Sequence, residues 1–222
     1  MTIPDRDTLA VFPVAGPPGA GKTTALITLD RQFPHLARFG VREYGLRIAH
    51  EGEPLGIEMR ETLLQNELLS NELVLREFLH FLDRVPAEVR SIAVEGYPRD
   101  RNQCADFMGA IASRKARIGA YVIVDVPDDV VRARVACRRI CARCGLPSST
   151  DSNAKNCSEC AGPVKARSDD ASSRLSRRLD DYRRLGGEVR SYFAGYDMVK
   201  SIDGLSSPDE VRRRLTELML SG

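Results

Sequence analysis

Short hydrophobic runs recur along the chain, and longer stretches with helical spacing separate them. The runs are apolar and partly β-branched, and they occupy residues 9–15, 91–94, 121–126 and 198–202. Runs of this length that alternate with helical patterning are typical of buried parallel strands in a sheet covered by helices on both faces. The pattern therefore predicts an α/β fold with one substantial core.

An amphipathic helix is predicted between the first two runs. Val74, Phe78, Phe81 and Leu82 stand at i, i+4, i+7 and i+8, which is the spacing of one helix face. Ser70 precedes this segment and is a residue type that caps the N-termini of helices. We expect a helix that starts after Ser70 and buries this face.

Pro13 conflicts with the strand predicted for residues 9–15. Proline has no backbone N–H, so a proline at a central strand position removes a hydrogen bond from the ladder. We therefore expect this strand to be shortened or bulged near Pro13.

A phosphate-binding motif follows the first hydrophobic run. Residues 16–23 read Gly-Pro-Pro-Gly-Ala-Gly-Lys-Thr, which matches G-x-x-x-x-G-K-[ST] and precedes a helical segment. The glycines let backbone N–H groups turn toward phosphate oxygens, while Lys22 supplies a cation and Thr23 a hydroxyl for Mg²⁺. The motif indicates a nucleoside triphosphate site without identifying the enzyme. The residues expected to bind ATP here are Gly16, Gly19, Ala20, Gly21, Lys22, Thr23 and Thr24.

Four cysteines form two Cys-x-x-Cys pairs, a spacing typical of structural zinc sites. Each pair can place two thiolates on one ion in a tight turn, and four thiolates complete a tetrahedral shell. Such a shell leaves no open coordination position, so we predict a structural rather than a catalytic Zn²⁺. The predicted ligands are Cys141, Cys144, Cys157 and Cys160.

Composition narrows the class of protein. The chain has 222 residues, of which 42% are hydrophobic, and its 33 Lys and Arg stand against 31 Asp and Glu. A net charge of +2 gives no overall attraction to nucleic acid or anionic lipid. No apolar stretch approaches the ~20 residues that a membrane span needs, and residues 1–9 lack the pattern of a secretory signal. We expect a cytoplasmic protein that binds small molecules.

Residues 94–99 read Val-Glu-Gly-Tyr-Pro-Arg and follow the second hydrophobic run. This segment resembles the Asp-Gly-Phe-Pro-Arg segment of adenylate kinases and related nucleoside monophosphate kinases. Residues 46–47, Leu-Arg, and the later segment 53–56 are similar to the monophosphate-binding helix pair of that family. Gln103 stands four residues after Arg99, where the family has a base-reading glutamine. Together with the phosphate-binding motif and the cysteine pairs, the resemblance covers nearly the whole chain.

The resemblance implies a P-loop NTPase fold with a five-stranded parallel sheet, a helical monophosphate-binding insert and a four-cysteine zinc lid. It assigns residues 1–40, 70–135 and 169–222 to the core, 41–69 to the monophosphate-binding subdomain and 136–168 to the lid. It further implies transfer of the γ-phosphoryl group from MgATP to AMP, which yields two ADP. The expected partners are ATP and a nucleoside monophosphate, without membrane or nucleic acid, and the expected state is a monomer.

The resemblance also implies roles for individual residues. Arg134 and Arg138 would contact the ATP phosphates together with the P-loop. The implied catalytic residues are Lys22, Arg138, Arg167 and Arg178. The implied monophosphate-binding residues are Arg47, Glu67, Leu68, Leu69, Gly96, Arg99, Gln103, Arg167 and Arg178.

Positive charge is concentrated in the second half of the chain. Residues 132–190 contain 14 Lys and Arg against 7 Asp and Glu. Arg134 and Arg138 share one face of a predicted helix, and the same spacing holds for Arg174 and Arg178. Such a concentration suits a site that receives two polyphosphates.

The acidic pair Asp169-Asp170 has two interpretations. In the family that the chain resembles, a similar pair helps to organise the arginines when the lid closes. Carboxylates are also favoured in the first turn of a helix, where they need no further role. The sequence supports both interpretations equally.

Departures from the family pattern leave alternative functions open. Glu95 stands where the family has Asp, Arg42 stands where it has a small base-contacting Thr, and the lid is shorter than usual. One alternative keeps the same phosphoryl transfer but uses another nucleotide or a nucleotide-like acceptor. A second alternative is an ATP-dependent nucleic-acid-binding module, which the low net charge and the few aromatic residues near the cysteines disfavour.

Overall fold

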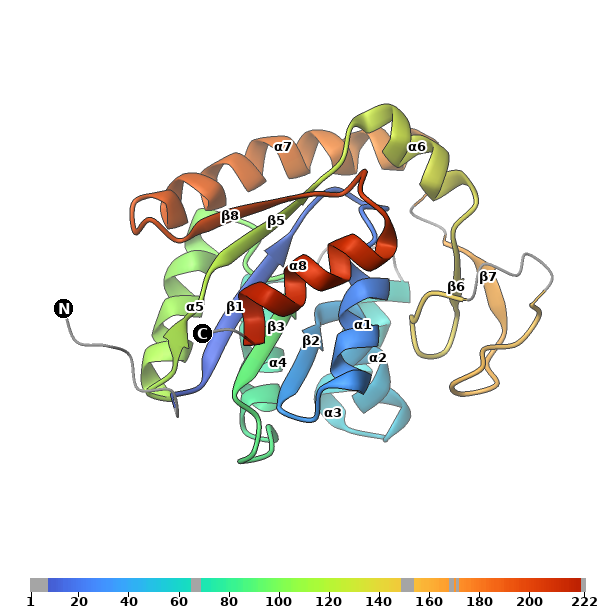
Figure 1. Cartoon of the computed structure of the whole chain (residues 1–222). Coiled ribbons are helices and arrows are strands. Elements are labelled where there is room, and N and C mark those ends of the chain that lie inside the picture. The colour runs from blue at the N-terminus through green and yellow to red at the C-terminus, as the bar shows by residue number, and fades with distance from the viewer. Residues whose placement is uncertain (1–7, 65–68, 149–153, 168–169, 171, 221–222) are drawn as a thin grey trace.

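A parallel sheet forms the centre of the molecule (Figure 1). The structure is a computed structural model that describes residues 8–64, 69–148, 154–167, 170 and 172–220. The main strands run side by side in the order β2-β3-β1-β5-β8, and all of these neighbours are parallel. The predicted α/β class with a five-stranded parallel sheet is confirmed. The strand bounds are β1 (Ala10–Ala15), β2 (Leu36–Gly40), β3 (Ser91–Glu95), β4 (Arg117–Ile118), β5 (Tyr121–Asp125) and β8 (Val199–Asp203).

β2 is the main strand that no hydrophobic run in the sequence predicts. Its sequence is Leu-Ala-Arg-Phe-Gly, in which Arg38 interrupts the apolar residues although Phe39 is fully buried. The strand pairs with β3 along its whole length and ends with Gly40 opposite Glu95. Pairing with a neighbouring strand, rather than continuous hydrophobicity, therefore defines β2.

Pro13 neither shortens nor bulges β1, so that expectation is wrong. Pro13 stands in regular register opposite Val94 of β3. On the other side of β1, Val11 O accepts a hydrogen bond from Gly119 N at 3.0 Å, and alternate residues of a strand face the same neighbour. Pro13, which has no N–H to donate, thus faces the point where β1 changes partner from β4 to β5. Neither Phe12 nor Pro13 is paired with a residue on that side, so no ladder hydrogen bond is lost.

Helices cover both faces of the sheet (Figure 1). They include α1 (Lys22–Gln32), α4 (Asn71–Leu82), α5 (Arg101–Ser113), α6 (Asp128–Ala136), α7 (Ser172–Ala194) and α8 (Pro208–Leu220). On one face, α1 and α8 contribute Leu26 and Leu215 to one buried cluster. On the other face, α4, α5 and α7 contribute Phe78, Phe107 and Phe193 to a second cluster. The core thus consists of two apolar layers, one on each side of the sheet.

The helix predicted after Ser70 is α4, and its cap is confirmed. Ser70 Oγ accepts the N–H of Leu73 at 3.1 Å, and the four apolar positions predicted for this helix are all buried. Leu82 is the last residue of the helix. The 3.6-residue period of the sequence therefore identified both the element and its buried face.

Two small units branch from this core. α2 (Val41–His50) and α3 (Pro54–Leu64) form a close helical pair, because a Cβ at Gly56 would lie 2.2 Å from Ala49 N. β6 (Arg139–Cys141) and β7 (Val164–Ala166) form an antiparallel hairpin beyond α6. These units fall within the segments that the resemblance assigns to the monophosphate-binding subdomain and to the lid.

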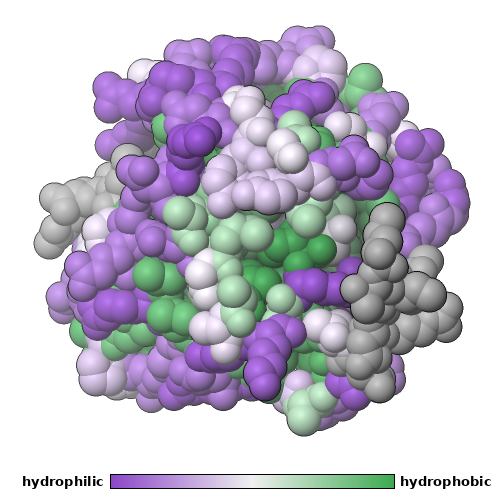
Figure 2. Space-filling view, turned by 90° about the vertical axis from the view of Figure 1, so that its left-hand side faces the viewer, coloured by the Kyte–Doolittle hydropathy of each residue, from purple (hydrophilic) through white to green (hydrophobic). Residues whose placement is uncertain are grey.

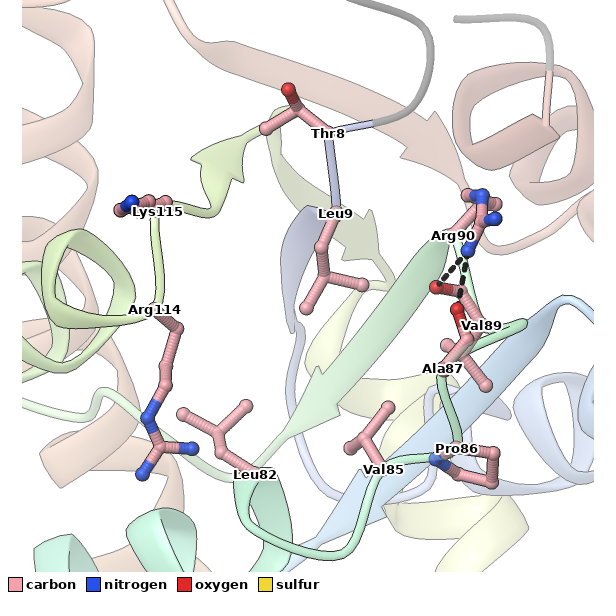
Figure 3. A pocket seen from close by; sticks show the side chains of 10 residues that line it. All are labelled: Thr8, Leu9, Leu82, Val85, Pro86, Ala87, Val89, Arg90, Arg114 and Lys115. Atoms are coloured by element: carbon pink, nitrogen blue, oxygen red, sulfur yellow. Dashed lines mark hydrogen bonds between the residues drawn. The ribbon is translucent and has the colours of Figure 1, made fainter.

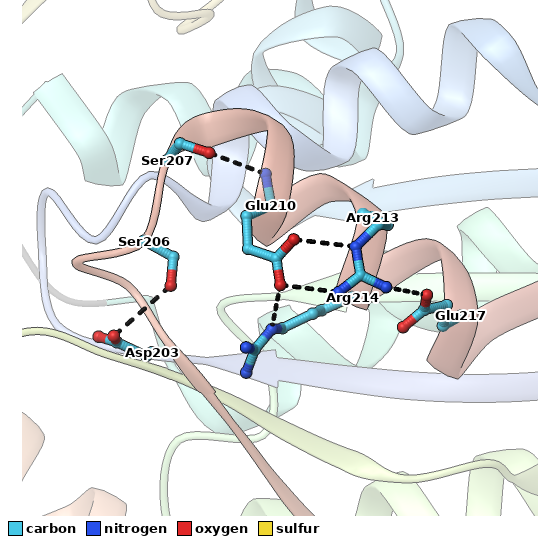
Figure 4. Close-up of polar contacts among 7 residues, drawn as sticks. All are labelled: Asp203, Ser206, Ser207, Glu210, Arg213, Arg214 and Glu217. Atoms are coloured by element: carbon cyan, nitrogen blue, oxygen red, sulfur yellow. Dashed lines mark hydrogen bonds and ion pairs between the residues drawn. The ribbon is translucent and has the colours of Figure 1, made fainter.

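Polar contacts define the start of α8 (Figure 4). Ser207 Oγ accepts the N–H of Glu210 at 3.2 Å, as an N-cap residue does. The carboxylate of Glu210 accepts hydrogen bonds from Arg213 and Arg214, which lower the pKa of Glu210 to about 2. Exposed ion pairs of this kind contribute little to stability, so α8 depends mainly on its buried face, which includes Leu215.

The surface mixes apolar and polar side chains. Figure 2 shows apolar side chains in the middle of one face, with hydrophilic side chains around them. Among the helices of the described residues, none is long and apolar enough to cross a membrane. Apolar atoms form a large part of ordinary protein surfaces, so this face by itself indicates no particular partner.

Glu77 of α4 is fully buried beneath α2. A Cβ at Gly45 of α2 would lie 3.3 Å from its Oε1, and neither carboxylate oxygen has a well-aligned hydrogen-bond donor within the described segments. Burial raises the pKa of Glu77 well above its usual value, and the negative charge of Glu43 adds to this. The N–H of Gly45 and the charge of Arg99 act in the opposite direction with less effect. Folding therefore shifts the titration of Glu77 toward its protonated form.

We expect Glu77→Leu to stabilise the protein by about 1 to 3 kcal/mol at pH 8, because it replaces an unsatisfied buried carboxyl group with an apolar side chain. The pKa of Glu77 is higher in the folded than in the unfolded protein, so the wild type loses stability as the pH rises above about 4.5. The advantage of the variant should therefore grow from pH 4.5 to pH 8. Urea unfolding of the wild type, Glu77→Leu and Glu77→Gln over this range measures the effect. A pH-independent difference would contradict it.

Candidate functional site

The phosphate-binding motif forms a tight loop between β1 and α1. Gly16, Gly19 and Gly21 have φ angles of 150°, 78° and 90°. A Cβ at Gly16 would lie 2.4 Å from Val124 O, and one at Gly19 would lie 2.8 Å from Val135 Cγ2. The loop thus passes too close to β5 and α6 for a side chain at either position, and the positive N-terminal end of α1 lies directly after it.

Lys22 is the first residue of α1, and its side chain folds back over the loop. Its Nζ donates hydrogen bonds to Gly16 O at 2.9 Å and to Pro17 O at 3.0 Å. Burial lowers the pKa of Lys22 to about 8, although the negative charge of Glu95 opposes the shift. Three positive charges also lower this pKa, and they belong to Arg99, Arg138 and Arg178. The structure therefore brings four of the predicted site residues together around the P-loop.

Asp170 pairs with two of these arginines. Arg138 donates to both carboxylate oxygens of Asp170, from Nε to Oδ2 at 2.7 Å and from Nη2 to Oδ1. Arg178 Nη1 donates to Oδ1 at 3.0 Å, and the side chain of Asp170 is only 8% exposed. These contacts favour the interpretation in which the acidic pair organises the arginines. Asp169 lies outside the described residues.

Arg99 lies between the end of β3 and the start of α5. Its Nε donates to Gly96 O at 2.8 Å, and its backbone N–H donates to Gln103 Oε1 at 2.7 Å. Gln103 is buried, and its Nε2 donates to Asn71 Oδ1 at 2.8 Å, at the start of α4. The predicted residues Gly96, Arg99 and Gln103 thus form one hydrogen-bonded group.

Glu95, at the end of β3, connects the P-loop with Arg38, which the sequence analysis missed. Glu95 Oε1 accepts the hydroxyl of Thr23 at 2.5 Å, and its Oε2 accepts Arg38 Nη2 at 2.9 Å. Burial alone would raise the pKa of Glu95, but the charges of Arg38 and Lys22 and the two hydrogen bonds outweigh it and lower the pKa. Glu95 is therefore a charged group, held by donors on both oxygens. A charged residue inside an otherwise apolar strand is the signal that could have identified Arg38.

Two predicted arginines have contacts outside the group around Lys22. Arg134 Nη2 donates to Gly204 O at 3.0 Å, just beyond the end of β8. The guanidinium of Arg47, on α2, stacks over the ring of Tyr44 at 4.8 Å from the ring centroid. To contact phosphates as predicted, each of these two arginines would have to leave its present partner or gain a second one.

The remaining predicted residues lie beside the elements already described. Ala20 is buried in the P-loop, and Thr24 is exposed in the first turn of α1. Leu69 lies just before the cap of α4, and Arg167 directly follows β7. Two further predicted residues lie outside the part of the chain that the structure describes, namely Glu67 and Leu68.

The four cysteines of the two pairs gather beside the β6-β7 hairpin. Their Sγ atoms all lie within 4.8 Å of one another. Cys141 Sγ is 3.4 Å from Cys160 Sγ, and Cys144 Sγ is 3.8 Å from Cys157 Sγ. These separations are too long for disulfide bonds of about 2.05 Å, and they approach the ~3.8 Å expected between thiolates around one tetrahedral Zn²⁺. The donor set therefore fits a zinc ion.

A hollow of about 450 Å³ lies at the other end of the sheet (Figure 3). Its walls include Leu9 before β1 and Leu82 at the end of α4. Arg90 Nη1 donates to Ala87 O at 2.6 Å and to Val89 O at 3.3 Å beside it. In parallel α/β sheets ligands bind at the carboxyl ends of the strands, and this hollow lies at the amino ends. It is therefore separate from the candidate site.

The P-loop, together with the positive charges of Arg99, Arg138 and Arg178 that act on Lys22, is typical of a P-loop phosphotransferase. No family model matches the chain. It is 27% identical to the adenylate kinase of Carboxydothermus hydrogenoformans over 204 residues, which cover 89% of this chain and 94% of that protein. It is 28% identical to those of Clostridium acetobutylicum and Thermotoga maritima, over 88% and 91% of this chain and 92% and 94% of the relatives. In its sheet order, its four-cysteine cluster and its sequence over nearly the whole chain, the protein is similar to adenylate kinases.

We expect Lys22→Met to stabilise the nucleotide-free protein by about 1 to 3 kcal/mol at pH 7, because it removes a buried charge that other cations repel. The pKa of Lys22 falls from 10.5 to about 8 on folding, so the wild type gains stability as the pH rises from 8 to 10.5. The difference between the two proteins should therefore shrink over this interval. Chemical unfolding of both proteins between pH 7 and pH 10.5 measures it. A difference that grows with pH would contradict the lowered pKa.

Proposed function

We propose that the protein is a nucleoside monophosphate kinase that transfers the γ-phosphoryl group of ATP to AMP and forms two ADP. The observation that carries this proposal is the group of cations beside the P-loop, in which Asp170 pairs with Arg138 and Arg178 and the charges of these arginines and of Arg99 act on Lys22. Phosphoryl transfer depends mainly on alignment and on stabilisation of spreading negative charge, which such a group of cations supplies. The name adenylate kinase on relatives that align over nearly the whole chain supports AMP as the acceptor.

On the ATP side, the backbone N–H groups of the P-loop would surround the β- and γ-phosphates. Lys22 would leave Gly16 O and Pro17 O to contact these phosphates, because a phosphate oxygen is a stronger acceptor than a carbonyl. Arg138, and Arg134 after leaving Gly204 O, would reach the same phosphates from α6 and the segment after it. Positive charge would thus surround the group that is transferred.

Bound Mg²⁺ neutralises charge on the β- and γ-phosphates and fixes their geometry. Thr23 and Glu95 are the side chains that fit this ion, because they offer a hydroxyl and a carboxylate oxygen side by side at 2.5 Å. Both groups lie at the first turn of α1, next to Lys22. Oxygen donors of these types are those that the ion prefers.

On the acceptor side, Arg47 and Arg99 would bind the phosphate of AMP, and Arg167 and Arg178 would contact the group in transfer. A guanidinium suits these roles because it binds two oxygens at once and stays charged. The carbonyl of Gln103 already accepts from Arg99 N, so the amide hydrogens of Gln103 are the part that would meet the base. Gly96 and residues 67–69 would complete the nucleoside pocket.

No side chain has to act as a strong general base in this scheme. The acceptor is a phosphate oxygen that is already negative, so the site must align it rather than activate it. Asp170 would hold Arg138 and Arg178 in nearly their working positions before the substrates bind. Their rearrangement would then be small, which lowers the cost of organising charge at the moment of reaction.

The four-cysteine cluster would hold a structural Zn²⁺ that stabilises the lid. All four donors are thiols, and a shell of four thiolates leaves no position for substrate. The lid over residues 136–168 and the helical unit over residues 41–69 would close on the two nucleotides and exclude water. The ion would thus act on lid geometry and not on the phosphoryl group.

Another nucleotide acceptor is the second candidate, and the position of Arg42 supports it. Arg42 lies on α2, where the resemblance has a small threonine against the base. A Cβ at Gly145, next to Cys144 in the lid, would lie 3.7 Å from Arg42 Cγ and 3.0 Å from Leu46 Cδ1. A guanidinium between the lid and α2 could donate to base carbonyl groups, which adenine lacks.

We expect initial rates with MgATP to be highest with AMP among AMP, CMP, UMP, GMP and dTMP. Arg138→Ala should lower the AMP rate about 10³-fold, by analogy with arginines that contact transferring phosphoryl groups. Arg132→Ala is the matched control, because Arg132 is exposed on α6, just before Arg138, and bonds only Ser176 Oγ among its described contacts. It should retain the wild-type rate. Preference for a pyrimidine or guanine nucleotide would favour the second candidate, and no turnover would reject both.

We expect the purified protein to contain one zinc ion per chain and Cys144→Ser to lose it. The variant should unfold roughly 5 to 10 °C below the wild type, because ion binding stabilises the folded lid. Elemental analysis and thermal unfolding measure both effects. Cys137→Ser is the matched control, since Cys137 is an exposed cysteine outside the cluster. Equal metal content and melting temperature in Cys144→Ser and the wild type would contradict a zinc site.

A further inference from the structure

Arg38 is a buried cation beside the site, in addition to the arginines of the family pattern. It lies in β2, and its side chain is 7% exposed. Its Nη2 donates to Glu95 Oε2 at 2.9 Å and to Glu43 Oε2 at 3.1 Å. One guanidinium nitrogen therefore connects the carboxylate at the end of β3 with a carboxylate in the first turn of α2.

The connection continues to the P-loop. Glu95 uses its other oxygen, Oε1, to accept the hydroxyl of Thr23 at 2.5 Å. The contacts thus run from Thr23 through Glu95 and Arg38 to Glu43, and they join the start of α1 to the start of α2. The first of these helices belongs to the ATP side of the proposed site, and the second carries Arg47 of the acceptor side.

Gly40 provides the space for this connection. A Cβ at Gly40 would lie 2.5 Å from Glu43 Oε2 and 2.6 Å from Arg38 Nη2. The backbone of Gly40 is extended, with φ of −130° and ψ of 115°, which any residue can adopt. Glycine is therefore needed here for the space that Arg38 and Glu43 occupy, and not for backbone conformation.

We infer that Arg38 is a positioning residue that directs Glu95 toward the Mg²⁺ side of the P-loop and ties it to α2 through Glu43. Glutamate has one more rotatable bond than the aspartate usual at this position, so one anchored oxygen is needed to direct the other. Arg38 anchors Oε2, and Oε1 then faces Thr23. The inference rests on the proposed function, in which these oxygens serve the metal ion of MgATP.

The consequence is a selective effect on metal-dependent binding. Without Arg38, Glu95 loses its anchor and Glu43 loses its cation, while the P-loop and Lys22 keep their contacts with phosphates. Removing a group that orients a metal-binding side chain typically weakens metal binding about 10- to 100-fold. The loss should therefore be confined to nucleotide binding in the presence of Mg²⁺ and to acceptor binding through α2.

Equilibrium calorimetry with the non-hydrolysable analogue β,γ-imido-ATP tests the inference without turnover. Each protein is titrated once with Mg²⁺ and once with a chelator. In Arg38→Met the gain in affinity that Mg²⁺ brings should fall about 10-fold or more, while metal-free binding should stay within about twofold of the wild type. Arg38→Lys should restore part of the gain, because its ammonium group keeps the charge but lacks the planar fork.

Gly40→Ala tests the same contact by a steric route. The added methyl group should separate Arg38 from Glu43 and weaken Mg²⁺-dependent binding, but it should cause no further loss in the Arg38→Met background. Arg114→Met removes the 2.6 Å ion pair between Arg114 and Asp83 elsewhere on the surface, and should behave as the wild type. Thermal unfolding checks that each variant is folded. Should Arg38→Met not fold, Arg38→Lys and Gly40→Ala decide the question.

Three results would overturn the inference. The first is equal weakening of binding with and without Mg²⁺, which would indicate a structural role alone. The second is wild-type behaviour of Arg38→Met, and the third is a wild type that binds the analogue no better with Mg²⁺. Failure of the proposed function would look different, because the Mg²⁺-dependent gain would remain sensitive to Arg38 while no nucleoside monophosphate was phosphorylated.

Discussion

The repulsion among partly buried cations is the constraint that the site must satisfy before any phosphate binds. Lys22, Arg138 and Arg178 belong to one group of charges, and the lowered pKa of Lys22 reports the cost of burying it there. Two carboxylates offset this cost. Glu95 faces Lys22, and Asp170 pairs with both arginines. The folded protein thus carries its own substitutes for phosphate oxygens, and the geometry that they maintain is one that a phosphate can use.

This charge balance explains why the site draws on so many elements. Parallel strands bring their carboxyl ends to one edge of the sheet, where β1 leads into the P-loop and β3 ends with Glu95. The segment after α6 and the helix α7 then bring Arg138 and Arg178 to the same carboxylate, that of Asp170. Cations on a single helix could not surround a phosphate, because residues three or four positions apart all point to one face.

Residue type and spacing predicted the parts of the site that local sequence determines. The P-loop, the zinc-type cysteine pairs and the helix capped by Ser70 are of this kind, because each depends on neighbours within about 20 residues. Contacts between distant segments escaped prediction. Pro13 is tolerated because β1 changes partner beside it, and β2 forms although Arg38 interrupts its apolar pattern. Nothing in the sequence near Asp170 distinguished a cap from a partner of Arg138.

Glu95 and the residues around it depend on one another. A longer carboxylate at this position gains reach but loses direction, so a second donor has to hold it, and Arg38 supplies that donor. A cation there needs a further carboxylate, which Glu43 provides, and the pair needs the space that Gly40 leaves. Each residue thus compensates for the unpaired charge or the lack of space that another introduces. A substitution at one of these four positions is therefore expected to change the effect of substitutions at the others, as residues in one buried polar network do.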